Sequence, residues 1–348
     1  MVQQVENKYQ PVIITDIRQE VPGVKTFILE PALSYKAGQF LTFAIQHHHR
    51  EERRSFSISS SPVLNEPLSI TVKRVDNGVY SRLLIDRAKP GDLLYTTGAA
   101  GLFTLPGDIA AYKQLFFFAA GIGITPIYSI IKTVLFTQPG LTVVLVYSNS
   151  TIADTVFYNE LNELADQFFE RFRIVFLFSN SFQLARARLN KELLPTLLAE
   201  LSTAPKENTL YYTCGPFSYM RMVLYALEEQ GIPADNVKKE NFNTERKPII
   251  RHQPPDKNAH NTIIKIAGKE YSFTAQYPET ILQAAKKNGV VLPYSCEIGR
   301  CGSCAAICTK GKVWMSNNEV LTNSDLEKGM ILTCVGYPVD GNIYLEIS

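Results

Sequence analysis

The most informative stretch of this sequence is Cys296-Glu-Ile-Gly-Arg-Cys301-Gly-Ser-Cys304, which places three cysteines in one tight loop. A fourth cysteine, Cys334, follows after a gap of 29 residues. This Cys-x4-Cys-x2-Cys…Cys spacing is that of plant-type [2Fe–2S] sites, in which four thiolates hold two irons. Gly299 and Gly302 let the backbone fold close to such a cluster, so that N–H groups reach the sulfurs. The sequence therefore predicts a [2Fe–2S] cluster on Cys296, Cys301, Cys304 and Cys334.

A structural zinc site is the alternative for the same four cysteines. Zinc sites more often use two separate Cys-x2–4-Cys knuckles, whereas the fourth cysteine here stands alone. Cys308 follows Cys304 by four residues and fits neither pattern, so we expect ordinary packing for it. In a chain of this size without a visible secretory signal, such a cluster favours metal or redox chemistry over disulfides.

Composition sets the broad class of the protein. The chain has 348 residues, of which 45% are hydrophobic and 20% charged, which predicts two or three folded domains. Lys and Arg number 35 against 33 Asp and Glu, so the formal charge of +2 argues against nucleic-acid binding. No run approaches 18 apolar residues, so no membrane span is expected. The first eight residues lack the apolar core of a signal peptide, and we expect a cytoplasmic protein.

Residues 1–108 are predicted to form a small antiparallel β-barrel. Gly and Pro turns separate six short apolar or alternating runs, as is typical of such barrels. The runs are Pro11–Ile17, Thr26–Glu30, Phe40–Ile45, Arg54–Ser59, Leu68–Val75 and Leu93–Thr97. One helix fits Gly78–Asp86. Three adjacent histidines, residues 47–49, invite a metal interpretation, but neighbouring side chains in a strand point apart, and a polar hairpin turn is the better interpretation.

Residues 109–243 change character, because strands now alternate with helices. The compact apolar runs are Leu115–Ala120, Leu141–Tyr147, Arg173–Phe178 and Leu210–Thr213. Helical patterns lie between them, for example at Asp154–Gln167 and Phe217–Gln230. This alternation predicts an α/β domain with a doubly wound parallel sheet.

A Pro-rich polar stretch, residues 244–260, is predicted to be a linker. Residues 261–348 then form a third, smaller domain. Thr262–Ala267 and Lys269–Thr274 are typical of a hairpin, and Glu279–Asn288 of a helix that Gly289 ends. The cysteine loop follows this helix.

Two loops of similar design follow strands of the middle domain. The first is Gly121-Ile-Gly123-Ile-Thr125-Pro126, where glycines after a strand let the backbone approach a pyrophosphate. Thr125 suits an N-cap and Pro126 the first helical position. The second loop is Cys214-Gly215-Pro216-Phe217, in which Pro216 also suits a helix start. In a doubly wound sheet the first and fourth strands flank the switch point where ligands bind, so the two loops together predict a nucleotide site.

Two segments of the barrel could hold a flavin. In Arg54-Ser55-Phe56-Ser57, the Arg can bind a phosphate, the Ser hydroxyls can bond ring atoms and the Phe can stack on a flat ring. Gly78-Val79-Tyr80-Ser81 precedes a helix whose N–H groups can meet a phosphate. Taken alone, Arg54–Ser57 is better explained as an ordinary strand with one exposed arginine.

As a set, these motifs resemble those of the ferredoxin–NADP reductase family. Arg54–Ser57 resembles its Arg-x-Tyr-Ser motif, with Phe56 in place of Tyr. Residues 72–74 and 78–81 resemble its flavin-pyrophosphate segment, and the two loops of the middle domain resemble its Gly-x-Gly-x-Thr-Pro and Cys-Gly-Pro motifs. The order of flavin, NAD(P) and C-terminal plant-type ferredoxin domains is similar to the reductase components of oxygenases, those of ring epoxidases included. The resemblance covers about residues 8–348 and implies a ferredoxin-like β-grasp fold for the last domain.

The resemblance implies a role for each matching residue. The implied catalytic residues are Ser57, Thr125, Cys214 and Glu240. The implied flavin ligands are Arg54, Ser55, Phe56, Ser57, Val72, Lys73, Gly78, Val79, Tyr80, Ser81 and Phe242. The implied nucleotide ligands are Gly121, Gly123, Thr125, Pro126, Ser148, Cys214, Gly215 and Pro216. FAD is favoured over FMN because residues 78–81 supply a second phosphate site.

The nucleotide preference depends on the residues beside the ribose. An acidic residue at the end of the second strand of the middle domain would favour NAD. After this strand, no acidic residue occurs before Asp154. Arg186 and Arg188 follow the third strand and can meet the 2′-phosphate of NADPH, although they are equally compatible with solvated surface residues. We therefore expect NADPH, with NADH as the alternative.

The implied function is to convert two-electron into one-electron transfer. NAD(P)H gives up two electrons together and a [2Fe–2S] cluster accepts one at a time, so a flavin is needed between them. The expected partner is a terminal oxygenase or hydroxylase. Three alternatives stay open: a fatty-acid desaturase or another one-electron acceptor protein as partner, a redox-sensing module, and a flavoprotein with a zinc-stapled tail.

Overall fold

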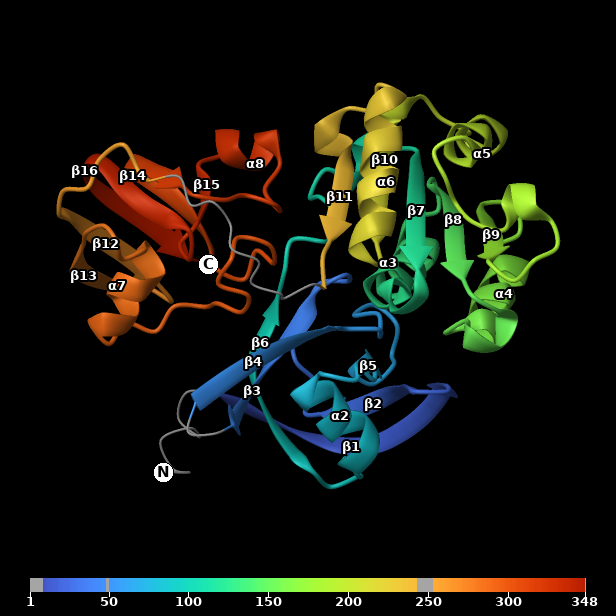
Figure 1. The fold of residues 1–348 in the computed structure, drawn as a ribbon, viewed down its shortest axis with the longest axis horizontal. Coiled ribbons are helices and arrows are strands. Elements are labelled where there is room, and N and C mark those ends of the chain that lie inside the picture. Colours follow the sequence, from blue (N-terminus) through green and yellow to red (C-terminus); the bar gives the residue numbers. More distant parts are fainter. Residues whose placement is uncertain (1–8, 48–49, 243–252, 348) are drawn as a thin grey trace. The chain divides into compact units, whose positions relative to one another are not determined.

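The computed structural model describes residues 9–47, 50–242 and 253–347, and divides the chain into two compact units. The first unit is Met1–Asn243 and the second is Thr244–Ser348. The first unit contains two sheets and the second unit contains one (Figure 1). Each unit is described by itself below.

The first sheet has six antiparallel strands in the order β4-β3-β6-β1-β2-β5. They are β1 (Gln10–Val21), β2 (Val24–Glu30), β3 (Phe40–His47), β4 (Arg50–Ser57), β5 (Ser69–Lys73) and β6 (Leu93–Ala100). All six predicted strands are present. A single bridge between Ile58 and Ile70 joins the chain just after β4 to β5, but β4 and β5 are not paired along their length, so the sheet is not fully closed. Helix α2 (Val79–Arg87) packs against the barrel core through Leu84.

The predicted hairpin turn at the three histidines agrees with the strand pairing. Strands β3 and β4 are antiparallel neighbours, with His47 opposite Arg50. His48 and His49 lie outside the described residues.

The second sheet has five parallel strands in the order β11-β10-β7-β8-β9. Its strands are β7 (Gln114–Ala120), β8 (Thr142–Asn149), β9 (Phe172–Phe178), β10 (Thr209–Cys214) and β11 (Val237–Glu240). The first and fourth of these strands in chain order, β7 and β10, are neighbours, so the predicted switch point is confirmed. The short edge strand β11 is not among the predicted strands.

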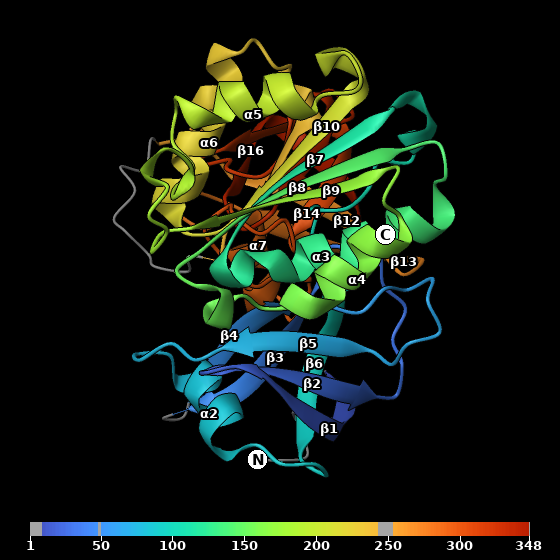
Figure 2. The same cartoon turned by 90° about the vertical axis from the view of Figure 1, so that its right-hand side faces the viewer.

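Helices cover both faces of this sheet, as Figure 2 shows. Helices α3 (Ile124–Thr137) and α4 (Tyr158–Gln167) cover one face, and α5 (Leu193–Leu201) and α6 (Phe217–Glu229) cover the other. The strands are apolar on both sides because each face is buried against helices. Short 3-10 turns occur at 109–111, 121–123, 152–154, 184–186, 206–208 and 234–236.

The second unit contains a mixed five-stranded sheet in the order β13-β12-β16-β14-β15. Its strands are β12 (His260–Ile266), β13 (Lys269–Ala275), β14 (Ala305–Met315), β15 (Met330–Leu332) and β16 (Gly336–Ile347). The two helices are α7 (Ile281–Lys287) and α8 (Asn323–Glu327). The hairpin and the helix predicted from sequence are both present, and Gly289 adopts the positive φ of 72° expected after a helix.

The predicted linker, residues 244–260, is described only from residue 253 onward; residues 244–252 lie outside the described residues. The described part is tied to the second unit. The Asp256 carboxylate lies 2.6 Å from His260 Nε2 and accepts from the Asp340 N–H at 3.0 Å. Pro254 is buried. These contacts attach residues 253–260 to the β12–β16 sheet, so they differ from the predicted free linker.

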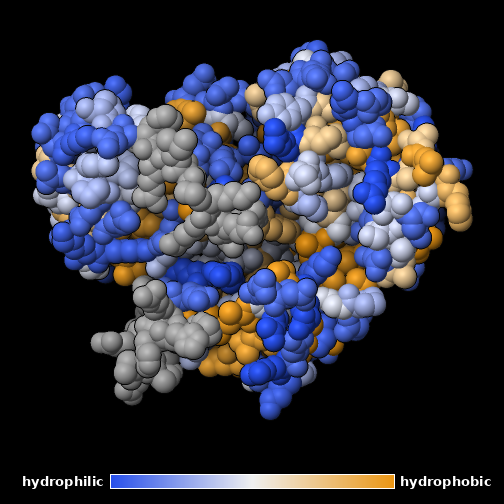
Figure 3. Space-filling view, viewed as in Figure 1, coloured by the Kyte–Doolittle hydropathy of each residue, from blue (hydrophilic) through white to orange (hydrophobic). Residues whose placement is uncertain are grey.

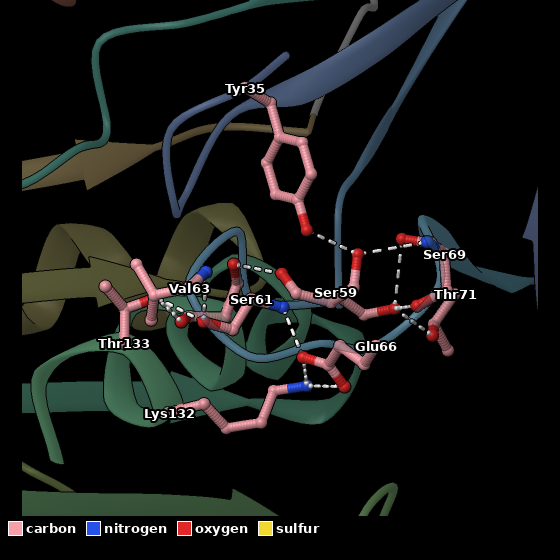
Figure 4. A network of polar contacts seen from close by, with 11 residues as sticks. Tyr35, Ser59, Ser61, Val63, Glu66, Ser69, Thr71, Lys132 and Thr133 are labelled. Atoms are coloured by element: carbon pink, nitrogen blue, oxygen red, sulfur yellow. Dashed lines mark hydrogen bonds and ion pairs between the residues drawn. The ribbon is translucent and has the colours of Figure 1, made fainter. Parts of the chain in front are cut away.

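An ion pair between a buried lysine and a partly exposed glutamate joins the barrel to the parallel sheet within the first unit (Figure 4). Lys132 Nζ, on α3, lies 2.6 and 2.8 Å from the carboxylate oxygens of Glu66, in the segment before β5. The same carboxylate accepts from the Ser61 N–H. Burial lowers the pKa of Lys132, and Glu66 opposes that shift. Nearby, the Ser129 hydroxyl donates to the Ser60 carbonyl at 2.6 Å. These contacts fix helix α3 on the barrel.

We expect Glu66→Ala to destabilise the first unit by about 3 kcal/mol, because it leaves the Lys132 ammonium buried without a carboxylate. Unfolding in urea, monitored through the release of the flavin, measures this loss of stability. The matched control is Asp86→Ala, which breaks an exposed pair with Arg74 and should cost far less. Equal midpoints for Glu66→Ala and the unmodified protein would contradict the assignment.

Among the described residues, no helix is both long enough and apolar enough to cross a membrane. Figure 3 shows that the visible face of β12, β13 and β16 in the second unit is mostly hydrophilic. On the first unit, apolar side chains form patches between hydrophilic ones in the same view.

Candidate functional site

The switch point brings together three residues that are distant in sequence: Ser57, Cys214 and Glu240. Ser57 ends β4 of the barrel, whereas Cys214 and Glu240 end the paired strands β10 and β11. The Ser57 hydroxyl donates to Glu240 Oε2 at 3.0 Å, across 183 residues of sequence. All three residues are buried. Three of the four predicted catalytic residues therefore lie together where the barrel meets the sheet.

Burial controls the ionisation of this group. It raises the pKa of Glu240 to about 8, and the Ser57 hydroxyl lowers it by a smaller amount. Burial also raises the pKa of the Cys214 thiol, and the charge of Glu240 raises it further. Both groups are consequently protonated near neutral pH. A neutral carboxyl bonded to a hydroxyl can hold a proton and exchange it inside a site closed to water.

The two glycines of the first loop have different roles. Gly121 has a φ of +54°, and a Cβ added there would meet nothing within 4 Å, so its backbone faces open space. A Cβ on Gly123 would lie 2.2 Å from the Cys214 carbonyl oxygen. Gly123 therefore lets α3 approach β10, and Gly121 leaves room for a ligand.

The helix starts differ slightly from prediction. Helix α3 begins at Ile124 after a 3-10 turn, with Gly123 as N-cap, so Thr125 and Pro126 are its second and third residues. Pro126 is tolerated there because the first N–H groups of a helix have no partner within it. The Thr125 hydroxyl donates to the Ile122 carbonyl at 3.1 Å. Pro216 is the N-cap of α6, one position before its expected place.

A cavity of about 700 Å³ opens beside these loops. This volume is typical of sites for small-molecule ligands and cofactors. Five predicted residues line it: Lys73, Gly121, Ser148, Arg188 and Pro216. Sequence reasoning missed the other lining residues, notably Asp154, Ser218, Tyr219 and Met222. Helical spacing could have indicated Tyr219 and Met222, since positions three apart on α6 share a face.

Arg186 is not in the wall of this cavity. Its guanidinium lies 2.5 Å from the Glu200 carboxylate of α5. Arg188 and the acidic Asp154 both line the cavity, and the Asp154 carboxylate accepts from the Thr151 hydroxyl at 2.8 Å. The two arginines are therefore not equivalent, although their sequence context predicted the same role for both.

Three helix N-termini suit phosphate groups. In α2, α3 and α6, no side chain caps the first turn and no acidic residue lies in it. By contrast, α7 and α8 have capping boxes, and the Asn190 side chain accepts from Leu193 N–H at the start of α5. Free N–H groups at the positive end of a helix bind anions. The chain thus offers phosphate sites on both the barrel and the sheet.

The predicted flavin residues converge only in part. Phe56 of β4 packs against Tyr80 of α2 with ring centroids 5.7 Å apart, which joins the two flavin segments. The Ser81 hydroxyl bonds the Gly78 carbonyl and the Val75 N–H and so shapes the loop before α2. Three further predicted residues, Ser55, Gly78 and Val79, lie in the same two segments.

Three other predicted flavin residues lie apart from that contact. Val72 is fully buried in the barrel core and offers no surface to a ligand. The Arg54 side chain is partly exposed beside Glu52. Phe242, beyond β11, is 39% exposed and is not part of the cavity wall.

The four predicted cluster cysteines of the second unit interact as two pairs. Cys296 pairs with Cys301 and Cys304 with Cys334. The largest effect on Cys296 is the hydrogen bond from Cys301, which helps to lower its pKa to about 6; backbone N–H groups of residues 298, 300 and 301 add to it. Within the described residues, no three Cys, His, Asp or Glu side chains converge on one ion. The two pairs also act on each other, because Cys304 raises the pKa of Cys301 and Cys296 raises that of Cys334. Two neighbouring pairs of thiols suit two irons.

The loop around these cysteines is shaped by left-handed backbone at Glu297, Gly299 and Gly302, with φ of 57°, 77° and 73°. This confirms the role expected for the two glycines. Thr333 ties the distant ligand to the loop, because its N–H donates to the Cys304 carbonyl at 3.1 Å just before Cys334. Cys308 lies on β14, where its thiol faces the Lys310 carbonyl at 3.5 Å, and it is partly exposed rather than buried.

Comparison with protein-family models finds three domains in the predicted order. Residues 24–105 match an oxidoreductase FAD-binding domain, residues 117–224 an oxidoreductase NAD-binding domain, and residues 264–339 a 2Fe-2S iron-sulfur cluster binding domain. The predicted FAD, nicotinamide nucleotide and [2Fe–2S] cofactors are thus confirmed at the level of domains, and the zinc alternative is set aside. The predicted boundaries at 108/109 and 260/261 fall between matches and stay proposals.

Several characterised proteins resemble the chain along most of its length. It is 33% identical over 326 residues to the ferredoxin reductase component of 3-ketosteroid-9-alpha-monooxygenase from Rhodococcus rhodochrous, covering 91% of this chain and 89% of that protein. It is 29% identical over 324 residues to one of the subunits of 1,2-phenylacetyl-CoA epoxidase from Escherichia coli K12, covering 92% and 90%. The fold of phthalate dioxygenase reductase matches with a TM-score of 0.60 at 22% identity, over 98% of this chain and 99% of that one.

Proposed function

Because the chain belongs to the family of FAD- and [2Fe–2S]-containing reductase components of oxygenases, we propose that it takes electrons from NAD(P)H and delivers them singly to a separate terminal oxygenase or hydroxylase. The observation that carries the proposal is the meeting of Ser57 with Glu240 beside Cys214, in a chain that also holds four paired cysteines. When bound, the nicotinamide, flavin and cluster supply the electron chemistry, and the protein supplies binding, orientation and proton control.

The residues that would hold the cofactors fit their chemistry. The N-terminus of α2 and Arg54 on β4 would bind the flavin pyrophosphate, and Phe56 would contact the flavin ring. Gly121 and the first turns of α3 and α6 would bind the pyrophosphate of the nicotinamide nucleotide. Two phosphate-binding segments favour FAD over FMN. Cys296, Cys301, Cys304 and Cys334 would hold the cluster.

The role proposed for Ser57 and Glu240 is to hold and move a proton. Each electron pair that enters a buried site is accompanied by a proton, and that proton must later leave. The Ser57 hydroxyl and the neutral Glu240 carboxyl, 3.0 Å apart, form a two-group route out of the water-excluded centre. Buried Cys214 and Thr125 close the site on the side of the sheet.

Arg188 is proposed to set the nucleotide preference. It is the member of the predicted arginine pair that lines the cavity, and its charge would meet the 2′-phosphate of NADPH. Ser148, at the end of β8, would contact the ribose beside it. NADPH is accordingly the proposed donor, with NADH as the alternative.

We expect Arg188→Ala to raise the KM for NADPH about tenfold and to leave the KM for NADH within about twofold, since a charged contact contributes about 1.5–3 kcal/mol. Steady-state reduction of an artificial acceptor with each nucleotide measures this. Arg186→Ala is the matched control and should change neither value, because Arg186 is held by Glu200. An unchanged ratio of the two KM values in Arg188→Ala would rule out this role.

An anaerobic visible spectrum with stepwise addition of NADPH or NADH tests the whole proposal. Bleaching of a flavin band and an iron–sulfur shoulder establishes the electron path; a cluster that stays oxidised would favour the redox-sensing alternative. Mixing the reduced protein with a purified oxygenase or a fatty-acid desaturase then distinguishes the acceptors. We propose a cytoplasmic location, since cysteines that hold an iron–sulfur cluster as thiolates suit a reducing compartment.

A further inference from the structure

Tyr219 occupies an unusual position in the wall of the nucleotide cavity. It lies in the first turn of α6, directly after the Cys214-Gly215-Pro216 loop. Its ring packs on Gly215, where an added Cβ would lie 3.2 Å from Tyr219 Cδ1 and 2.9 Å from the Ala120 Cβ. Because Gly215 has no side chain, it leaves the space that the Tyr219 ring occupies.

Three buried polar groups in the same wall have no hydrogen-bond partner: the hydroxyl of Tyr219, the hydroxyl of Ser148 and the side-chain nitrogen of Asn149. Buried polar groups are nearly always paired, and an unpaired one calls for an explanation. The neighbouring Tyr147 shows the usual case, because its hydroxyl donates to the Gly121 carbonyl at 3.0 Å. Three orphan groups around one cavity point to a polar ligand that completes them.

The chemistry of the three groups narrows the kind of ligand. Two hydroxyls and an amide nitrogen supply hydrogen-bond donors, and the uncapped N-terminus of α6 adds free N–H groups. Burial raises the pKa of Tyr219, so the phenol remains a donor. Hydrogen-bond donors of this kind suit the oxygens of a ribose and its phosphate better than an uncharged aromatic ring.

We propose that Tyr219 is a nucleotide-positioning residue, whose hydroxyl bonds the ribose–phosphate of NAD(P)H together with Ser148. The inference rests on the proposed function, since it assigns a contact within the same cavity. The polar atoms of Tyr219 and Ser148 are shielded from water. Their bonds to the nucleotide therefore form only when it enters between β8 and α6. Binding then satisfies groups that the protein alone leaves unpaired.

The test is Tyr219→Phe in the full-length holoenzyme, titrated with NADP⁺ and with NAD⁺ and followed by the flavin difference spectrum. We expect the Kd to rise about tenfold, which equals about 1.4 kcal/mol. The limiting rate of flavin bleaching by NADPH should stay within about twofold, because the phenol acts on binding. The Tm should stay level or rise, because the variant removes an unpaired buried hydroxyl.

Tyr212→Phe is the matched control. Tyr212 is also a buried tyrosine of this domain, but its hydroxyl donates to the Thr104 carbonyl at 3.1 Å. The Tyr212→Phe variant should lower the Tm and leave the Kd unchanged, which is the opposite of the pattern expected for Tyr219→Phe. A Tyr219→Phe variant with an unchanged Kd would overturn the inference, whatever its Tm. Failure of the unmodified protein to bind or be bleached by either nucleotide would instead overturn the proposed function.

Ser148→Ala gives an independent check. If Ser148 and Tyr219 bond the same part of the nucleotide, the double variant should weaken binding by less than the product of the two single effects. If the effects of the two single variants on the Kd multiply in the double variant, the two groups do not share the contact, and Ser148 is removed from the proposal.

Discussion

Cys334→Ser is expected to lose the iron–sulfur cluster and to reduce an external one-electron acceptor at least about 100-fold more slowly, since the loss of a metal ligand exceeds the effect of removing an outer-shell partner. Cys334 is the distant member of the Cys304–Cys334 pair, and Thr333 beside it bonds the Cys304 carbonyl. Bleaching of the flavin by NADPH should persist within about twofold. The reason is that the nucleotide cavity and the flavin segments lie in the first unit.

Cys308→Ser is the matched control for this result. Cys308 lies on β14 of the same sheet but outside both sulfur pairs, so iron content and acceptor reduction should match those of the unmodified protein. Iron and acid-labile sulfide analysis, with stopped-flow flavin bleaching, measures both variants. Full iron content in Cys334→Ser would remove Cys334 from the ligand set. One zinc per chain in the unmodified protein would contradict the cluster altogether.

Short-range patterns predicted most of the fold. The six barrel strands, four of the five parallel strands and the hairpin and helix of the second unit follow from apolar runs and turn residues. Strand β11 is four residues long and contains two lysines, so its sequence gives no strand signal; pairing with β10 makes it a strand. The start of α3 was predicted late because its 3-10 entry turn uses Gly123 as the cap.

The site was less predictable because its contacts are long-range. The cysteine spacing is local and pointed to the cluster directly. The bond between Ser57 and Glu240 joins residues of different domains, and the family resemblance implied a catalytic role for each without pairing them. Arg186 and Arg188 have the same sequence context, yet Glu200 on α5 holds the first and leaves the second in the cavity wall. Such distinctions depend on packing between elements, which periodicity does not contain.

Glu240→Gln is expected to slow NADPH-driven acceptor reduction by about 100-fold, since general acid–base groups contribute about 10²–10⁴-fold. The amide keeps the size of the side chain and a hydrogen bond with Ser57, but it cannot take up or release a proton. The pH profile of acceptor reduction should also lose its inflection near the Glu240 pKa of about 8. Stopped-flow and steady-state rates between about pH 6 and about pH 10, roughly two units on either side of that pKa, measure both effects.

The same substitution should change stability in a pH-dependent way. The folded pKa of Glu240, about 8, lies above its ordinary value of 4.5, so between these values the unfolded chain releases a proton that the folded protein keeps. The contribution of Glu240 to stability therefore falls as pH rises from 4.5 to 8, by about 5 kcal/mol in total at about 1.36 kcal/mol per unit. A glutamine at this position does not titrate, so the variant should gain stability relative to the unmodified protein as pH rises through this window.

Glu200→Gln separates this effect from the loss of a carboxylate in general. Glu200 is a partly exposed residue of the same domain, and its replacement should leave the acceptor rate and the inflection near pH 8 unchanged. Persistence of that inflection in Glu240→Gln would assign it to another group, with buried Cys214 the nearest candidate on the neighbouring strand. A slow rate combined with a stability difference that does not vary with pH would contradict the raised pKa of Glu240 and its role as a proton carrier, because a group that carries the proton must contribute both signatures.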